Sequence, residues 1–159
     1  MNVPDANSVT AISLAAIFLI WPAMEDLKFQ SFALRPVLIL GTVCLGLRLL
    51  AAAAGWTAMP DPVLMLTGPV PGLLMMLLGR QSQGKVGLGD GLALAVMGLL
   101  TGLSEAVVIL LIALTLCSLT GLILILGRRA HRGTALPFLP YLEAGCLIEL
   151  VSCLYQGQR

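Results

Sequence analysis

The chain has 159 residues, of which 58% are hydrophobic and only 11% are charged, and its mean hydropathy is +1.00 with a formal net charge of +1. This composition is typical of membrane proteins and excludes an ordinary soluble domain. The near-zero charge gives no basis for binding nucleic acid, and we expect none.

Apolar runs fill the chain from one end to the other. A helix needs ~20 mostly apolar residues to cross ~30 Å of hydrocarbon. About six such runs fit, and they leave no room for a separate soluble domain. We therefore predict an all-α, polytopic membrane protein with about six transmembrane helices in one domain, residues 1–159. The expected spans are 9–24, 36–54, 62–79, 91–103, 107–126 and 141–155.

The positions of the basic residues predict an orientation. No Lys or Arg precedes the first run, so it lacks the basic start of a secretory signal, and we expect a retained helix. The loops after the second and fourth runs, around "GWTAMPDP" and "LSEA", contain no basic residue. The loops after the first, third and fifth runs contain Lys28, Arg35, Arg80, Lys85, Arg128, Arg129 and Arg132. The positive-inside rule makes these three loops cytoplasmic and places both termini outside.

Pro69 and Pro71, between Gly68 and Gly72, should kink or break the third helix, either beside a cavity or as a simple packing kink. In the fourth run, Gly98 is one of several small residues that allow close contact between helices in lipid.

Two aspartates fall near the predicted cytoplasmic interface. Asp90 ends the stretch "GLGD" at the start of the fourth run, and Asp26 follows the first run. Each has a structural interpretation: Asp90 as a helix N-cap after the turn residues Gly87 and Gly89, and Asp26 as a charge in the headgroup region. The predicted topology puts both carboxylates on the same side, so a helix bundle can bring them together.

These residues resemble the type IV prepilin peptidases, which are membrane aspartyl proteases named for a GxGD motif. The likeness includes "GLGD" at 87–90 followed by Leu94, Ala95, Gly98 and Gly102. It also includes "EDLKFQSFALRP" as the first catalytic loop, and "ALPFLPYLEAG" at 135–145 as the family's Pro-Phe-x-Pro-Phe-Leu stretch. It covers nearly the whole chain. The resemblance implies that Asp26 and Asp90 are the catalytic pair.

The chain departs from the family pattern at several positions. Leu92 stands where many members have Lys, and Phe32, Ala33 and Leu34 stand where Ile-Pro-Asn is usual. The CxxC-containing insertion of the larger members, linked to methyl transfer, is absent, so we expect a peptidase without methyltransferase activity. Four single cysteines, which lack metal-ligand spacing, are interpreted as packing residues: Cys44, Cys117, Cys146 and Cys153. No metal or other cofactor is expected.

Two neighbouring carboxylates cannot both ionise cheaply, so the pair shares a proton. The ionised member takes a proton from water, while the protonated member binds the developing oxyanion. Gly87 and Gly89 would let a peptide backbone approach, and Glu25 either attracts a basic leader or is a solvated charge. The resemblance implies a bacterial inner-membrane enzyme whose partners are the lipid bilayer and a prepilin or pseudopilin with a basic leader and an apolar helix.

Two other functions stay open. A small transporter or channel subunit would use the intramembrane charges Arg48, Glu143 and Glu149, of which the two glutamates are candidate partners for the arginine. A catalytically silent scaffold of a pilus or secretion apparatus is the third. Neither the oligomeric state nor the roles of the two aspartates as base and acid follow from the sequence.

Overall fold

The computed structural model describes residues 6–29, 34–55, 61–81, 87–127 and 137–157. All regular secondary structure in these ranges is helical, which confirms the all-α prediction for this part of the chain. The helices are α1 (Ala6–Phe29), α2 (Leu34–Ala53), α3 (Pro62–Thr67), α4 (Val70–Gln81), α5 (Leu88–Thr101), α6 (Leu103–Leu126) and α7 (Leu139–Gly157).

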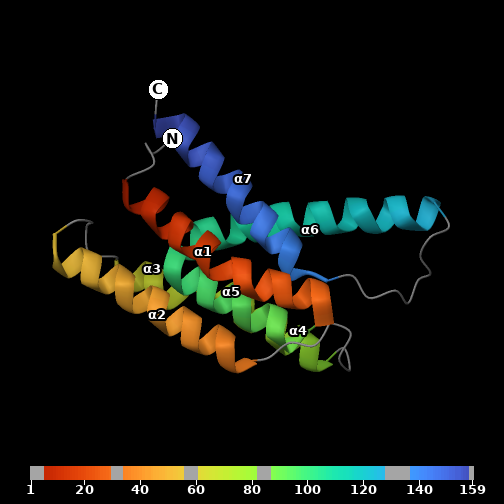
Figure 1. Ribbon diagram of the computed structural model, residues 1–159, viewed down its shortest axis with the longest axis horizontal. Helices are drawn as coiled ribbons and strands as arrows, with labels where there is room; N and C mark the ends of the chain where they lie inside the picture. The colour runs from red at the N-terminus through yellow and green to blue at the C-terminus, as the bar shows by residue number, and fades with distance from the viewer. Residues whose placement is uncertain (1–5, 30–33, 56–60, 82–86, 128–136, 158–159) are drawn as a thin grey trace.

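Helix α5 lies at the centre of the molecule and packs against each of the other six helices (Figure 1). It fits there because its residues are small or apolar, and most of its length is buried. A Cβ atom added at Gly98 would overlap the carbonyl oxygen of Gly68, and one added at Gly72 would overlap the backbone nitrogen of Ala95. The backbones of α4 and α5 are therefore in direct contact, as predicted for Gly98 from its small size.

The third predicted span is broken at the position where its two prolines predicted a break. Helix α3 ends at Thr67 and α4 begins at Val70, with Gly68 and Pro69 between them. The backbone N–H of Leu73 donates to the Pro69 carbonyl at 3.0 Å, so the second helix restarts directly after the break.

The prediction of a loop at residues 103–106 is wrong, because these residues form the first turn of α6. The chain reverses at Gly102 alone, which has a φ of 98° that favours glycine. The N–H of Gly102 donates to the Gly98 carbonyl at 2.7 Å, and the Gly102 carbonyl accepts from Ala106 at 3.1 Å. Glu105 therefore stands at the N-terminal end of a helix, where a negative charge is favourable.

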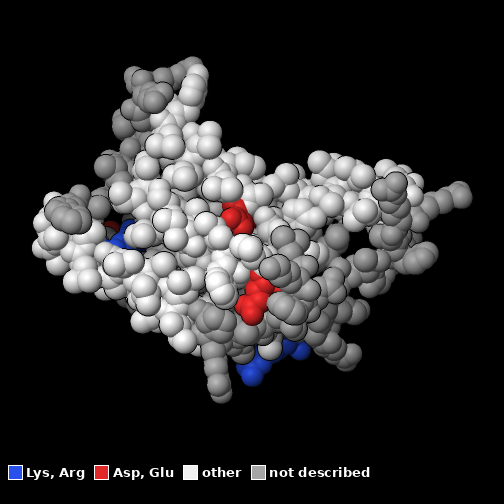
Figure 2. Space-filling view, viewed as in Figure 1, with Lys and Arg blue, Asp and Glu red and all other residues white. Residues whose placement is uncertain are grey.

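The outer surface is largely apolar. Ile17, Leu50 and Val151 are 60%, 67% and 65% exposed on α1, α2 and α7. Figure 2 shows one face with little charge: Asp and Glu are visible mainly near its middle, and Lys and Arg at its lower edge and at its left side. Two described helices are long and apolar enough to cross a membrane: α1 over Ser8–Asp26, and α6. An apolar surface this extensive exceeds the patches normally found on soluble monomers.

Several helix ends that adjoin the basic stretches lie in the same part of the molecule. The start of α2, the end of α4 and the start of α5 lie along the lower edge of Figure 1, near the end of α1. Arg80 is exposed in the last turn of α4. Lys85, Arg128, Arg129 and Arg132 lie outside the described residues.

Candidate active site

Asp90 lies in the first turn of α5 and does not cap that helix. The N-cap position is occupied by Gly87, whose φ and ψ of −66° and 125° are extended, and no side chain caps the helix there. The N-cap interpretation of Asp90 is therefore excluded. The side chain is instead partly buried near the point where α5 enters the bundle.

The carboxylate of Asp90 folds back over Gly87. A Cβ atom added at Gly87 would lie 2.8 Å from the Asp90 Oδ2 atom. Gly87 is exposed and Gly89 is buried, so the two glycines of "GLGD" have different surroundings. Gly87 leaves space for the carboxylate itself, which is a role that the sequence did not indicate.

Asp26 lies near the end of α1 and touches the start of α7. Its Oδ2 atom accepts a hydrogen bond from the backbone N–H of Leu139 at 3.3 Å. Leu139 is the first residue of α7, and N–H groups in a first helical turn have no partner within their own helix. The Asp26 carboxylate therefore supplies one of the acceptors that α7 lacks.

The structure brings Asp26 and Asp90 together, although they lie in different helices. Burial and, as the smaller cause, the negative charge of Asp26 together raise the pKa of Asp90 from 3.8 to about 6. The Asp26 carboxylate is thus close enough to influence the protonation of Asp90, as expected for two residues predicted at one interface. Their catalytic role stays a prediction.

The stretch that resembles the family's third motif completes this region. Phe138 and Leu139 are buried, and the Phe138 carbonyl accepts from the N–H groups of Tyr141 and Leu142 at 3.0 and 3.1 Å. A Cβ atom at Gly145 would lie 2.8 Å from the Ile109 carbonyl oxygen, so α7 packs closely on α6. Residues 137–145 thus fix the start of α7 beside Asp26. The motif resemblance marked this stretch, but gave no sign of the contact.

Other residues near the pair have simpler roles. Glu25 is partly exposed beside Asp26 on α1. Leu92, which replaces the family's common Lys, packs against the hydrophobic core. Cys44, Cys146 and Cys153 are buried free thiols, consistent with packing. Within the described ranges, His, Cys, Asp and Glu side chains form no cluster of three or more that could hold a metal ion.

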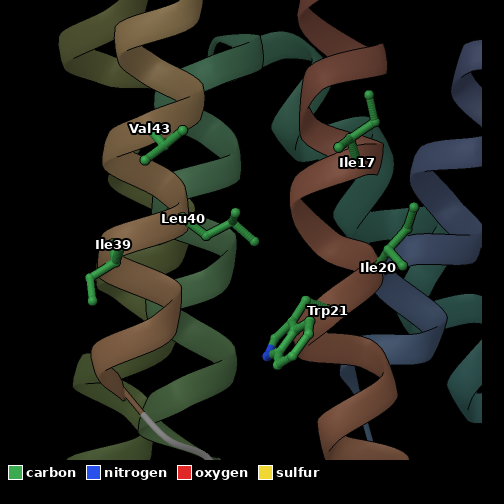
Figure 3. Close-up of a pocket in the computed structure, with 6 residues that line it drawn as sticks. All are labelled: Ile17, Ile20, Trp21, Ile39, Leu40 and Val43. Atoms are coloured by element: carbon green, nitrogen blue, oxygen red, sulfur yellow. The ribbon is translucent and has the colours of Figure 1, made fainter.

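An apolar groove of about 520 Å³ runs between α1 and α2 (Figure 3). Its lining residues are Ile17, Ile20, Trp21, Ile39, Leu40 and Val43. Trp21 and Leu40 point toward each other across it, and α5 lies behind it. Trp21 precedes Asp26 on the same helix by about one and a half turns, or ~7.5 Å.

The intramembrane charges are arranged differently from the prediction. Arg48 on α2 is influenced by the charge of Glu105, at the start of α6, rather than by Glu143 or Glu149. Its Nη1 atom is buried and has no hydrogen-bond partner among the described residues. Glu143 and Glu149 instead act on the Cys146 thiol of their own helix, α7. The pairing considered for the transporter function is therefore not present.

No family model, curated protein or solved structure matches the chain.

Proposed function

We propose that this chain is a membrane aspartic endopeptidase of the prepilin-peptidase type, with Asp26 and Asp90 as its catalytic pair. The observation that supports the proposal most directly is the electrostatic contact between these two carboxylates, which α1 and α5 hold together at one end of the bundle. A pair of carboxyl groups that share a proton is the central feature of aspartic protease chemistry.

The surface chemistry supports a location in a membrane. Long apolar helices and exposed Leu, Ile and Val side chains suit contact with lipid. We place the protein in the bacterial inner membrane as a multi-pass enzyme with its N-terminus outside. Asp26 and Asp90 then lie at the cytoplasmic interface, where the apolar runs of their helices end and begin.

The substrate class follows from that location and from the family resemblance. The proposed substrate is a prepilin or pseudopilin, with a basic leader in the cytoplasm and an apolar helix in the bilayer. Hydrolysis at the junction between them would occur at the depth of the carboxylate pair. Glu25, beside Asp26 and partly exposed, would attract the basic leader.

The chemistry needs only water and the two carboxyl groups. The ionised carboxylate takes a proton from water as the water oxygen bonds to the scissile carbonyl carbon. The protonated carboxyl donates to the carbonyl oxygen, which stabilises the tetrahedral intermediate. Transfer of a proton to the amide nitrogen then breaks the C–N bond and frees the leader.

The test is cleavage of a model prepilin by the purified protein in lipid. We expect wild type to cut at the leader junction and both Asp26→Asn and Asp90→Asn to lower kcat by about 10²–10⁴-fold, because each removes one member of the acid–base pair. Asn at position 26 can still accept a hydrogen bond from Leu139, so loss of that contact would not explain the effect.

Asp61→Asn is the matched control. Asp61 is exposed and accepts from the Val63 N–H at 2.9 Å at the start of α3. Asn serves equally well at such a position, so this variant should cleave like wild type. Cleavage at the wild-type rate by both Asp26→Asn and Asp90→Asn would refute the proposed function.

A further inference from the structure

We propose that the start of α7 sets the division of labour in the carboxylate pair: the Leu139 N–H holds Asp26 as the ionised base, and Asp90 is the member that carries the proton. Leu139 is then a positioning residue that acts through its backbone. This inference rests on the proposed function, because it names the roles of the two aspartates within the proposed reaction.

The contact with Leu139 favours a negative charge on Asp26, and the partial burial of this carboxyl group opposes that charge. Its Oδ2 atom accepts from the Leu139 N–H at 3.3 Å, at the N-terminus of a helix of 19 residues. The N-terminal end of a helix has a partial positive charge, and hydrogen bonds to an ionised acceptor are stronger than neutral ones. Leu139 is fully buried and Phe138 is 7% exposed, so this donor is held in place by the core.

The surroundings of Asp90 favour the neutral acid. No N–H or hydroxyl group among the described residues donates to its carboxylate, although it also lies in the first turn of a helix. Burial and, as the smaller cause, the charge of Asp26 together raise the pKa of Asp90 to about 6. When one proton is shared by the pair, it therefore resides mainly on Asp90.

Among the side chains that the structure describes, no basic group is among the causes that shift the pKa of Asp90. The negative charge of Asp26 reaches Asp90 from α1, and that of Asp90 reaches Cys117 on α6. Titratable groups with described side chains near these helix ends include Glu25 on α1, Arg80 on α4, and Tyr141 and Glu143 on α7. None of these is among the groups that shift the pKa of Asp90.

With these roles, every proton that is taken up or given off during the reaction is accounted for. Asp26 takes a proton from water while the water oxygen bonds to the carbonyl carbon, and Asp90 gives its proton to the carbonyl oxygen. The proton on Asp26 then passes to the amide nitrogen as the C–N bond breaks. Asp90 recovers a proton from a hydroxyl of the intermediate as the new carboxyl group forms.

The decisive variant is Leu139→Pro. Proline lacks the N–H group but is well tolerated at the first position of a helix. Leu139→Ala is the matched control, since it loses the same buried side chain and keeps the N–H. The readout is kcat/KM for the model prepilin against pH, where activity rises as Asp26 ionises and falls as Asp90 loses its proton.

We expect Leu139→Pro to move the acid limb of this profile upward by about one pH unit relative to Leu139→Ala. The basic limb should stay near its original position, so the pH range of activity narrows. Acid limbs that coincide in the two variants would overturn the proposal, because lost packing would then account for the whole effect.

A second readout does not depend on activity or on the folding of the Leu139 variants. The chain contains four aspartates, Asp5, Asp26, Asp61 and Asp90, so carbon-13 labelling of aspartate carboxyl groups gives a simple NMR titration in lipid. Signals are assigned by their loss in Asp26→Asn and Asp90→Asn. We expect Asp26 to ionise at lower pH than Asp90 in wild type, and the reverse order would refute the assignment. The expected order in a protein that cleaves no prepilin would instead refute only the proposed function.

Discussion

At the scale of single residues, the fold disfavours the ionised form of Asp90. Its pKa is raised from 3.8 to about 6, first by burial and then by Asp26. The folded state therefore binds a proton more tightly than the unfolded chain. Ionisation costs almost nothing below about pH 3, where both states are protonated, and its cost grows as the pH rises to about 6.

We predict that Asp90→Asn stabilises the protein at neutral pH. Asparagine is nearly isosteric and cannot ionise, so it removes a cost of about 3 kcal/mol above pH 6. The gain in Tm over wild type should be near zero at pH 3, should grow as the pH rises to about 6, and should then level off. Thermal unfolding in lipid at a series of pH values measures it.

Asp61→Asn again provides the comparison, because that side chain is exposed and far from the pair in sequence. It should show no comparable gain between pH 4 and 6. A gain in Asp90→Asn that is the same at every pH would contradict the prediction, since it would come from packing and not from charge. Stability gained together with activity lost would be the expected signature of a functional carboxylate.

At the scale of the helices, the contact between α4 and α5 places Asp90. Gly72 is buried against the backbone of Ala95 and the carbonyl of Gly91, and Gly91 follows Asp90 directly. No flexible side chain is available to move aside at Gly72. An added methyl group must therefore push the two helices apart and shift the start of α5.

We predict that Gly72→Ala lowers the free energy of unfolding by about 1–3 kcal/mol, the usual cost of overpacking, and also lowers kcat for the model prepilin. Gly46→Ala is the matched control, because nothing lies within 4 Å of a Cβ atom at Gly46 in the middle of α2. That variant should gain about 0.5–1 kcal/mol from helix propensity. Equal effects of the two substitutions on stability would show that α4 and α5 are not in tight contact.

Local sequence signals predicted most helices but not all of their ends. The proline pair predicted the break between α3 and α4, because proline in the interior of a helix removes a hydrogen bond and clashes with the preceding turn. The polar residues Ser104 and Glu105 suggested a loop, yet α6 begins at Leu103 because Gly102 alone makes the turn. No sequence pattern marks a single glycine that adopts a positive φ. Two adjacent polar residues, in contrast, are typical of a loop.

The features of the candidate site also fall into those that the sequence predicted and those that it did not. The meeting of Asp26 and Asp90 was predictable, because the charge pattern assigned both residues to one interface. The hydrogen bond from Leu139 to Asp26 was not, since it joins residues far apart in sequence through a backbone group. The influence of Glu105 on Arg48 was also not predicted, because the sequence analysis assigned Glu105 to a loop and not to a helix of the bundle.

At the scale of the whole molecule, the proposed function requires one particular orientation in the membrane. The basic residues predict that the end of α4 is cytoplasmic and that the loop before α3 is outside. Asp61 precedes α3, Gln81 ends α4, and both side chains are exposed. Labelling at these two positions therefore tests opposite sides of the bilayer.

We predict that Asp61→Cys reacts with a membrane-impermeant maleimide in intact spheroplasts, and that Gln81→Cys reacts only after the membrane is permeabilised. The native cysteines give little background, because Cys44, Cys146 and Cys153 are buried. Wild type corrects for any labelling of Cys117. The opposite pattern would put Asp90 on the outer side, away from a cytoplasmic leader. An orientation with Gln81 inside would leave the start of α5, which follows at Leu88, at the surface where the proposed substrate enters the membrane.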